Sequence, residues 1–275
     1  MPVHRIPWRR HAVADWCLYC YGWWQVPGQF FGGCGRWRRR WHFLPGAVLL
    51  AGVGYWDDHH DLPARWRALV HFAVAVGSVM ALSVADLPLG WWGAGLAVFA
   101  IVWSINLFNF MDGTDGIAGV EALFVLGVGG FFLWQVGAAA LAIPAWVLAA
   151  TVAGFLLWNW PRAKIFMGDV GSSVLGFLIA VVALAGEVWF DVPVLLWIIL
   201  YGVFCFDATV TLARRVIAGE RWYAAHRSHA YQRLYHPLGW SHGRILWGVI
   251  TVNSVLAGLA LWANAMPEMR LMLLG

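Results

Sequence analysis

The feature that most constrains this chain is a series of apolar segments, most of which approach the length that crosses a membrane as a helix. The runs cover residues 43–55, 68–85, 91–105, 117–137, 140–158, 170–185, 194–213 and 245–263. A spanning helix needs about 20 mostly apolar residues, and only the first run is clearly short. Charged residues make up 12% of the chain, against about a quarter in soluble domains. The sequence therefore predicts an all-α, polytopic membrane protein.

The segments between the runs alternate in character. Those at 56–67, 106–116, 159–169 and 214–244 are polar, and the intervening ones are short and contain no Lys or Arg. If every run crosses the membrane, the four polar segments lie on the same side. They hold ten of the eighteen basic residues, and the positive-inside rule makes that side cytoplasmic.

The segment 106–116 leaves one apolar run and enters the next with polar side chains at every third position. These are Asn106, Asn109, Asp112 and Asp115. Carboxylates beside a membrane are energetically costly, so a functional site is the first interpretation. A polar helix end facing water accounts for one Asp but poorly for four polar groups in register. Two glycines in the segment allow a sharp turn or close approach to a ligand.

Adjacent carboxylates also mark the segment 56–67, which contains Asp57, Asp58 and Asp61. Such groups suit Mg²⁺, which prefers oxygen ligands, or a general base. On this motif alone, a solvated acidic loop is an equal alternative because surface Asp is common.

The segment 159–169 runs into a predicted helix through Gly168, Asp169 and Gly171. A helix start offers backbone N–H groups to phosphate, and Asp169 offers a carboxylate to a metal. Lys164 is the only lysine in the chain. It is either a compact charge for phosphate or a chance survivor in an Arg-biased composition.

The segment 214–244 gathers His226, Arg227, His229, Tyr231 and Arg233 within eight residues. This combination suits a diphosphate clamp, and the alternative is a basic loop that contacts anionic lipid.

Two acidic residues, Glu121 and Asp207, lie inside apolar runs. They either form buried contacts between helices or extend the site.

Acidic groups beside basic ones on one membrane face predict a metal–diphosphate substrate, and the membrane predicts a lipid partner. Phosphoryl transfer between a soluble nucleotide and a lipid is the chemistry most consistent with this pattern. The alternatives are another lipid phosphotransferase or a pyrophosphatase, neither of which needs a UDP-sugar. A transporter would place ionisable groups near the bilayer midplane rather than at helix ends. No nucleic-acid partner is expected.

Four ordered motifs resemble the polyprenyl-phosphate N-acetylhexosamine-1-phosphate transferases. They are Asp57-Asp58-x-x-Asp61, Asn106-x-x-Asn109-x-x-Asp112-Gly-x-Asp115-Gly, Phe166-Met167-Gly168-Asp169-x-Gly171-Ser172 and the segment from His226 to Arg233. The last motif is most similar to the bacterial subgroup that initiates O-antigen or capsule repeat units. This subgroup is related to the enzymes that make peptidoglycan lipid intermediates.

The resemblance implies transfer of a sugar-1-phosphate from a UDP-N-acetylhexosamine to undecaprenyl phosphate, with release of UMP. It also implies dependence on Mg²⁺ or Mn²⁺ and a place in the bacterial inner membrane with the site facing the cytoplasm. A direct attack and a path through an aspartyl-phosphate are both compatible with these motifs. The sugar and the oligomeric state, including a homodimer, stay open.

By the same resemblance each motif has a role. Asp169 would bind the metal, and Phe166 would stack on uracil. Asn109, Asp112 and Asp115 would line the nucleotide pocket, with Asn106 and Lys164 also on the substrate side. Asp57 or Asp58 would deprotonate or orient the lipid phosphate, and His226, Arg227 and His229 would hold the diphosphate or the sugar.

The chain departs from the family's pattern in residues 1–42, before a transferase domain expected at 43–263 and a tail at 264–275. The family has two further helices and an Arg-Gly-Gly-Gly loop there, whereas this chain has Pro7-Trp8-Arg9-Arg10-His11. A one-base shift of suitable codons would restore that run. The segment is therefore interpreted either as an interfacial anchor or as a stretch read out of frame, which would leave an inactive, truncated member of the family.

Overall fold

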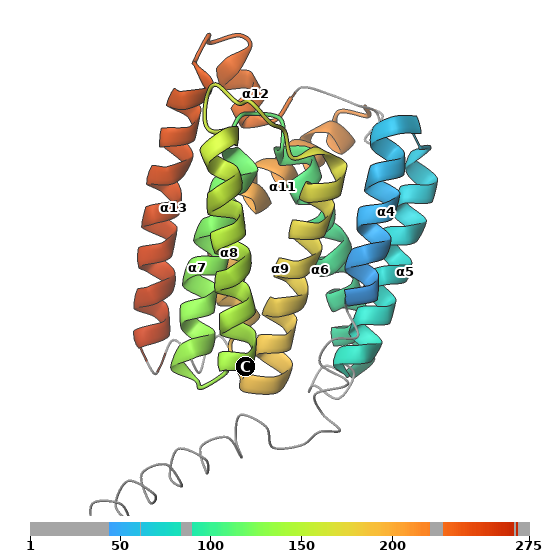
Figure 1. Cartoon of the computed structure of the whole chain (residues 1–275), viewed down its shortest axis with the longest axis vertical. Helices are drawn as coiled ribbons and strands as arrows, with labels where there is room; N and C mark the ends of the chain where they lie inside the picture. Colours follow the sequence, from blue (N-terminus) through green and yellow to red (C-terminus); the bar gives the residue numbers. More distant parts are fainter. Residues whose placement is uncertain (1–43, 61, 84–89, 221–227, 267, 269–275) are drawn as a thin grey trace, which may run out of the picture. The chain divides into compact units, whose positions relative to one another are not determined.

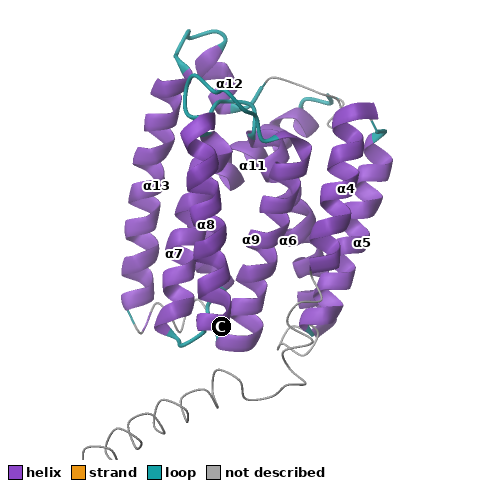
Figure 2. Ribbon diagram, in the orientation of Figure 1, coloured by secondary structure: helices purple, strands orange, loops and turns teal. Residues whose placement is uncertain are grey.

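The computed structural model describes residues 44–60, 62–83, 90–220, 228–266 and 268. The atypical segment 1–42 lies outside the described residues, so the interpretations given for it stay predictions. Throughout the described part the chain consists of helices and connecting loops, without a strand (Figure 2). The all-α prediction is confirmed.

The helices follow one another along the chain with short connections (Figure 1). They are α4 (Leu44–His60), α5 (Ala64–Leu82), α6 (Gly90–Met111), α7 (Ile117–Gln135), α8 (Ala139–Asn159), α9 (Gly168–Phe190), α10 (Val194–Leu200), α11 (Gly202–Ile217), α12 (Ala230–Tyr235) and α13 (His242–Ala265).

Six of the described helices are long and apolar enough to cross a membrane, namely α5, α6, α7, α8, α9 and α13. Their exposed surfaces carry large apolar side chains such as Trp92, Leu157 and Trp247. In a bilayer these side chains contact lipid. The chain is thus a multi-pass membrane protein, as its apolar runs predicted. The first run forms α4, whose 17 residues make it shorter than these six.

The run 194–213 is apolar as predicted, but it does not form one straight helix. It divides into α10 and α11, which are bent by 78° at Tyr201. At the bend, a Cβ on Gly202 would lie 2.8 Å from Leu256, so the missing side chain lets α13 approach closely. Beyond the bend α11 is amphipathic, with Asp207 buried and Phe206 exposed. Such a helix cannot continue as a segment that is apolar on every side.

Helix α9 packs against both α4 and α6, and glycines make these contacts close. A Cβ on Gly54 of α4 would lie 2.8 Å from the backbone of Val170, and one on Gly176 of α9 would lie 2.4 Å from the carbonyl oxygen of Ser104 in α6. The two helices therefore approach the backbone of α9 directly. This packing brings the end of α4, the end of α6 and the start of α9 together.

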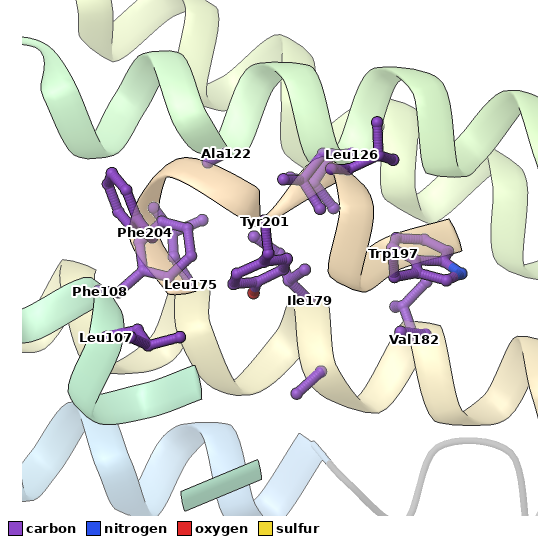
Figure 3. Close-up of a cluster of buried hydrophobic side chains, with 14 of the residues drawn as sticks. Leu107, Phe108, Ala122, Leu126, Leu175, Ile179, Val182, Trp197, Tyr201 and Phe204 are labelled. Atoms are coloured by element: carbon purple, nitrogen blue, oxygen red, sulfur yellow. The ribbon is translucent and has the colours of Figure 1, made fainter. Parts of the chain in front are cut away.

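Aromatic side chains fill the core beside the bent pair (Figure 3). Phe108, Trp197 and Phe204 are each at most 2% exposed. Phe108 meets Phe204 edge to face, with ring centroids 5.2 Å apart, which is a favoured aromatic geometry. This contact attaches α11 to α6. The loops that follow α4, α6 and α8 lie at one end of the helices together with α12, at the top of Figures 1 and 2.

Candidate functional site

The site centres on Arg67, in the first turn of α5. Its Nη1 atom lies 2.6 Å from Oδ2 of Asp57, at the end of α4, and 3.0 Å from Oδ2 of Asp169, at the start of α9. Two carboxylates that are far apart in the sequence thus converge on one nitrogen. Asp57 is only 8% exposed, so its charge needs a partner of opposite sign.

Asp169 has further partners from two other motifs. Its Oδ1 atom accepts a hydrogen bond of 2.7 Å from the Asn109 amide. Its backbone N–H donates to Oδ1 of Asp58 over 3.2 Å. Gly168 has a φ of +66°, and a Cβ there would lie 2.9 Å from Asp58. The structure therefore unites Asp57, Asp58, Asn109 and Asp169 in one cluster.

Asp112 follows the last residue of α6. Burial, and then the negative charge of Asp169, raise the pKa of Asp112 to about 7. Asn106 takes a different direction, because its amide donates to the carbonyl of Val102 within α6 over 2.7 Å. Asp112 thus belongs to the electrostatics of the cluster, whereas the hydrogen bond of Asn106 is internal to its helix.

Asp115 connects the 106–116 segment to two other parts of the chain. Its Oδ2 atom accepts a 3.2 Å hydrogen bond from the backbone N–H of Ala163 and lies 3.0 Å from Nδ1 of His242. Nearby, the Gly116 N–H donates to Oδ1 of Asn159 over 2.9 Å. The Asn159 amide donates in turn to the carbonyl of Ile165 over 2.7 Å. These bonds fasten the 159–169 segment beside the carboxylates.

Two predicted substrate ligands lie on the 159–169 segment, with their side chains directed to the surface. Phe166 is 76% exposed. The Nζ atom of Lys164 lies 5.2 Å from the centroid of the Trp158 ring, which is a cation–π distance. An exposed aromatic ring and an exposed lysine are accessible to a ligand from the loop side.

The last motif is only partly within the described residues, because His226 and Arg227 fall in the undescribed stretch 221–227. His229 comes directly before α12 and is 4% exposed. Its Nδ1 atom lies 3.6 Å from Oδ1 of Asp207, on α11. The motif therefore reaches the same end of the helices as the carboxylates, through a buried histidine.

Three residues of this region carried no separate signal in the sequence. In the sequence Arg67 is one of several basic residues in the polar segments. It reaches Asp57, ten residues earlier, because α4 and α5 form a helical hairpin. Asn159 and His242 make their contacts through loops whose paths depend on tertiary packing. Nothing in the sequence alone distinguishes such residues from ordinary helix ends.

The cluster offers carboxylate oxygens, which are the kind of ligand that Mg²⁺ prefers. Within the described residues, no group of three or more His, Cys, Asp or Glu side chains forms a metal site by itself. Mg²⁺, however, commonly binds one or two carboxylates and completes its shell with water and substrate phosphates. Asp57 and Asp169 both reach the same cationic nitrogen of Arg67, so both carboxylates already face a common position for positive charge.

Comparison with known proteins identifies relatives. The model of the family described as "Glycosyl transferase family 4" matches residues 41–187, which is more than half of the chain. A Bacillus subtilis protein described as "Probable undecaprenyl-phosphate N-acetylglucosaminyl 1-phosphate transferase" is 32% identical over 72% of this chain and 58% of its own length. The Yersinia pestis undecaprenyl-phosphate alpha-N-acetylglucosaminyl 1-phosphate transferase is 31% identical over 69% of this chain and 56% of its own length.

A third relative, the phospho-N-acetylmuramoyl-pentapeptide-transferase of Levilactobacillus brevis, is 28% identical over 76% of this chain and 70% of its own length. The match with this chain thus covers less than two thirds of the length of the Bacillus and Yersinia relatives. It covers slightly more than two thirds of the length of the Levilactobacillus relative. The matched region contains the Asp57, Asn109 and Asp169 motifs that make up the carboxylate cluster. The chain belongs to glycosyl transferase family 4.

Proposed function

We propose that this chain transfers a sugar-1-phosphate from a UDP-N-acetylhexosamine to undecaprenyl phosphate and releases UMP. The observation that carries the proposal is the convergence of Asp57 and Asp169 on Arg67 at the loop end of membrane-spanning helices. Opposite charges at a membrane surface suit a reaction between a soluble diphosphate and a lipid phosphate. The names of the Bacillus and Yersinia relatives describe this class of transfer.

The reaction exchanges one phosphoryl group between two phosphates. An oxygen of undecaprenyl phosphate forms a bond to the sugar-bearing phosphorus, and the bond from that phosphorus to the bridging oxygen of UDP breaks. UMP leaves with that oxygen, and the product is an undecaprenyl-diphosphate sugar. Such a reaction depends on positioning and on the stabilisation of phosphoryl charge.

The residues of the cluster divide this work. Asp57 or Asp58 orients the lipid phosphate and accepts its proton where it carries one. Asp169, with Asp57, Asp112 or Asp115, would hold Mg²⁺ or Mn²⁺, which supplies positive charge to the phosphate oxygens. Arg67 adds a fixed cation beside the same oxygens, in a site where charge stabilisation is the largest contribution.

The loops hold the nucleotide. Phe166 is exposed enough to stack on uracil. Lys164 and the basic residues His226, Arg227 and His229 are assigned to the diphosphate and the sugar. We place the site on the cytoplasmic face of a bacterial inner membrane, where UDP-sugars are available, and assign the product to the start of an O-antigen or capsule repeat unit.

The test uses membranes that contain the protein, supplied with Mg²⁺, undecaprenyl phosphate and a panel of UDP-N-acetylhexosamines. UMP and the lipid-linked sugar are measured together. We expect one sugar of the panel to give both products in equal amounts, and EDTA or Asp169→Asn to abolish them. Asp191→Asn is the matched control, because Asp191 is an exposed acid at the opposite end of the same helix.

Two results contradict the proposal. One is a well-inserted protein that gives no lipid-linked sugar with any donor of the panel. The other is release of phosphate from undecaprenyl diphosphate without any UDP-sugar, which indicates a pyrophosphatase instead.

A further inference from the structure

Asp207 is a buried acid that the proposed reaction has not used. It lies on α11 and is 8% exposed. Its Oδ1 atom accepts hydrogen bonds from the backbone N–H of Ala230, over 2.8 Å, and from the hydroxyl of Thr211, over 3.1 Å. The Nδ1 atom of His229 lies 3.6 Å from the same oxygen. One carboxylate oxygen thus faces both the His229 ring and the first residue of α12.

The His229 ring is also fixed on its faces. It stacks on Phe110 with ring centroids 6.2 Å apart and on Tyr231 with centroids 5.9 Å apart. Phe110 lies in the last turn of α6, two residues before Asp112. The position of His229 is therefore coupled to the end of the helix that carries the proposed nucleotide-binding residues.

Tyr231, in the first turn of α12, makes the same connection. Its hydroxyl donates to the carbonyl of Phe110 over 3.0 Å. A Cβ on Gly113 would lie only 2.2 Å from that hydroxyl, so the tyrosine packs directly on the backbone of the 106–116 segment. With Asp207 on one side and Phe110 on the other, the start of α12 has little freedom to shift.

We propose that Asp207 is a positioning residue of the transferase site, which holds the His229 ring and the start of α12 against the 106–116 segment. This inference rests on the proposed function, in which His229 contributes to binding the diphosphate or the sugar. A negative charge beside Nδ1 favours a hydrogen on that nitrogen and so orients the ring.

A double-mutant cycle separates positioning from general support of the fold. Asp207→Asn keeps an oxygen that accepts from Ala230 and Thr211, but it removes the charge that faces His229. We expect this change to lower kcat/KM for the UDP-sugar by about 10- to 100-fold, as for loss of a group that supports one acid–base or binding residue. In a His229→Ala background the same change should have no further effect.

The matched control is Glu187→Gln. The Glu187 carboxylate also accepts from the first backbone N–H of a helix, that of Val194 in α10, but it lies at the far end of α9 from Asp169. We expect transfer to be unchanged in this variant. An equal loss from Asp207→Asn with and without His229, or no loss in either background, overturns the proposal.

A second measurement does not depend on sugar-phosphate transfer, so it tests the position of His229 even if the wild-type protein is inactive. An inactive wild-type protein would count against the proposed function, not against the role of Asp207. Diethyl pyrocarbonate labels accessible imidazoles, and mass spectrometry reads each histidine. We expect Asp207→Ala to accelerate labelling of His229 several-fold, while His71, buried in α5, keeps its wild-type rate as a reference for the fold. An unchanged rate at His229 contradicts its positioning by Asp207, and equal acceleration at His71 reveals general unfolding instead.

Discussion

Arg67 illustrates how single residues determine the chemistry of this membrane face. Without a cation between them, Asp57 and Asp169 would place two negative charges together in a poorly hydrated position. Like charges at such distances repel strongly where the effective dielectric constant is low. The arginine thus keeps both carboxylates in place before any substrate binds.

We predict that Arg67→Ala lowers kcat for sugar-phosphate transfer by about 10²- to 10³-fold, the loss usual for removing one group that stabilises charge in the transition state. Arg67→Lys should retain part of the activity, because it keeps the charge but loses the planar geometry. The measurement is the initial rate of UMP release at saturating substrates. Arg65→Ala is the control, since Arg65 is an exposed cation in the same turn. A near-normal rate for Arg67→Ala would show that the pair has no part in the reaction.

Asp112 predicts a pH dependence. Its pKa of about 7 leaves the side chain largely protonated at pH 6 and charged at pH 8. If the carboxylate binds the metal or nucleotide, kcat/KM should rise through about pH 7 and then level off. Profiles between pH 5.5 and 8.5, for wild type and Asp112→Asn, test this. The variant should be less active and should lack the inflection near pH 7; an identical inflection in the variant assigns it to another group.

The same shift has a consequence for stability, with a definite sign. Because the pKa of Asp112 is higher in the folded protein than its usual 3.8, the folded state binds the proton more tightly. Raising the pH from about 4 to 7 therefore removes stability through this group. In detergent and without added metal, Asp112→Asn should lose less thermal stability over that range than the wild type. A larger loss in the variant would contradict the direction of the shift.

The sequence motifs indicated which residue types lie together at this end of the helices, but not all of their contacts. Asn109, Asp112 and Asp169 do gather, as the motifs indicated. For Asn106 the structure shows only a hydrogen bond within α6, so its place on the substrate side stays a prediction. The pairing of Arg67 with Asp57 has no signature in the sequence, because only the hairpin of α4 and α5 brings the two residues together.

At the scale of helices, the site depends on how closely α4 approaches α9. Gly54 lies one turn before Asp57 and Asp58, and the backbone of Val170 occupies the space where a side chain would be. The glycine therefore sets the distance between the two helix ends that carry the carboxylates.

We predict that Gly54→Ala pushes the end of α4 away from α9 and lowers transferase activity by about 10²-fold, as expected for a displacement of about 1 Å in a catalytic group. The melting temperature should also fall, because overpacking against backbone is costly. Gly52→Ala is the matched control on the same helix, since a Cβ there meets nothing within 4 Å. Equal activity in the two variants would remove the argument that this contact aligns the site.

The bend between α10 and α11 is the element that hydropathy alone did not predict. A run of apolar residues indicates that a segment is buried in lipid or protein, but not that it is straight. Here the buried carboxylate of Glu121 on α7, which accepts a 2.7 Å hydrogen bond from Asn253, lies near the backbone of Phe204 at the start of α11. Such a contact arises only after α7, α11 and α13 have packed together.

For the whole molecule, hydropathy predicted the membrane helices closely. The runs 117–137 and 140–158 correspond to α7 (Ile117–Gln135) and α8 (Ala139–Asn159). Their alternation also predicted polar segments at one end, where Figure 1 shows the loops after α6 and α8 and helix α12. This agreement is expected because a chain in lipid must satisfy its backbone within each segment, so that length and polarity largely determine the spans.

Orientation in the membrane is the remaining property of the whole molecule, and it follows from charge. The loop end carries Arg162, Lys164 and Arg214 among other basic residues, whereas the described loops at the opposite end contain none. Under the positive-inside rule, this distribution of charge supports the proposed cytoplasmic orientation of the carboxylate cluster. Helix α13 offers a direct test, because it begins at the loop end and finishes at the other.

We predict that a cysteine in place of Leu238, just before α13, reacts with a membrane-impermeant maleimide only after spheroplasts are opened. A cysteine in place of Met266, just after α13, should react in intact spheroplasts. Both native side chains are exposed, at 64% and 42% respectively, so accessibility within the protein is matched. The four native cysteines are first replaced by alanine in both variants. The opposite pattern would place the cluster outside the cytoplasm, away from UDP-sugars, and would exclude the proposed reaction while leaving the fold unchanged.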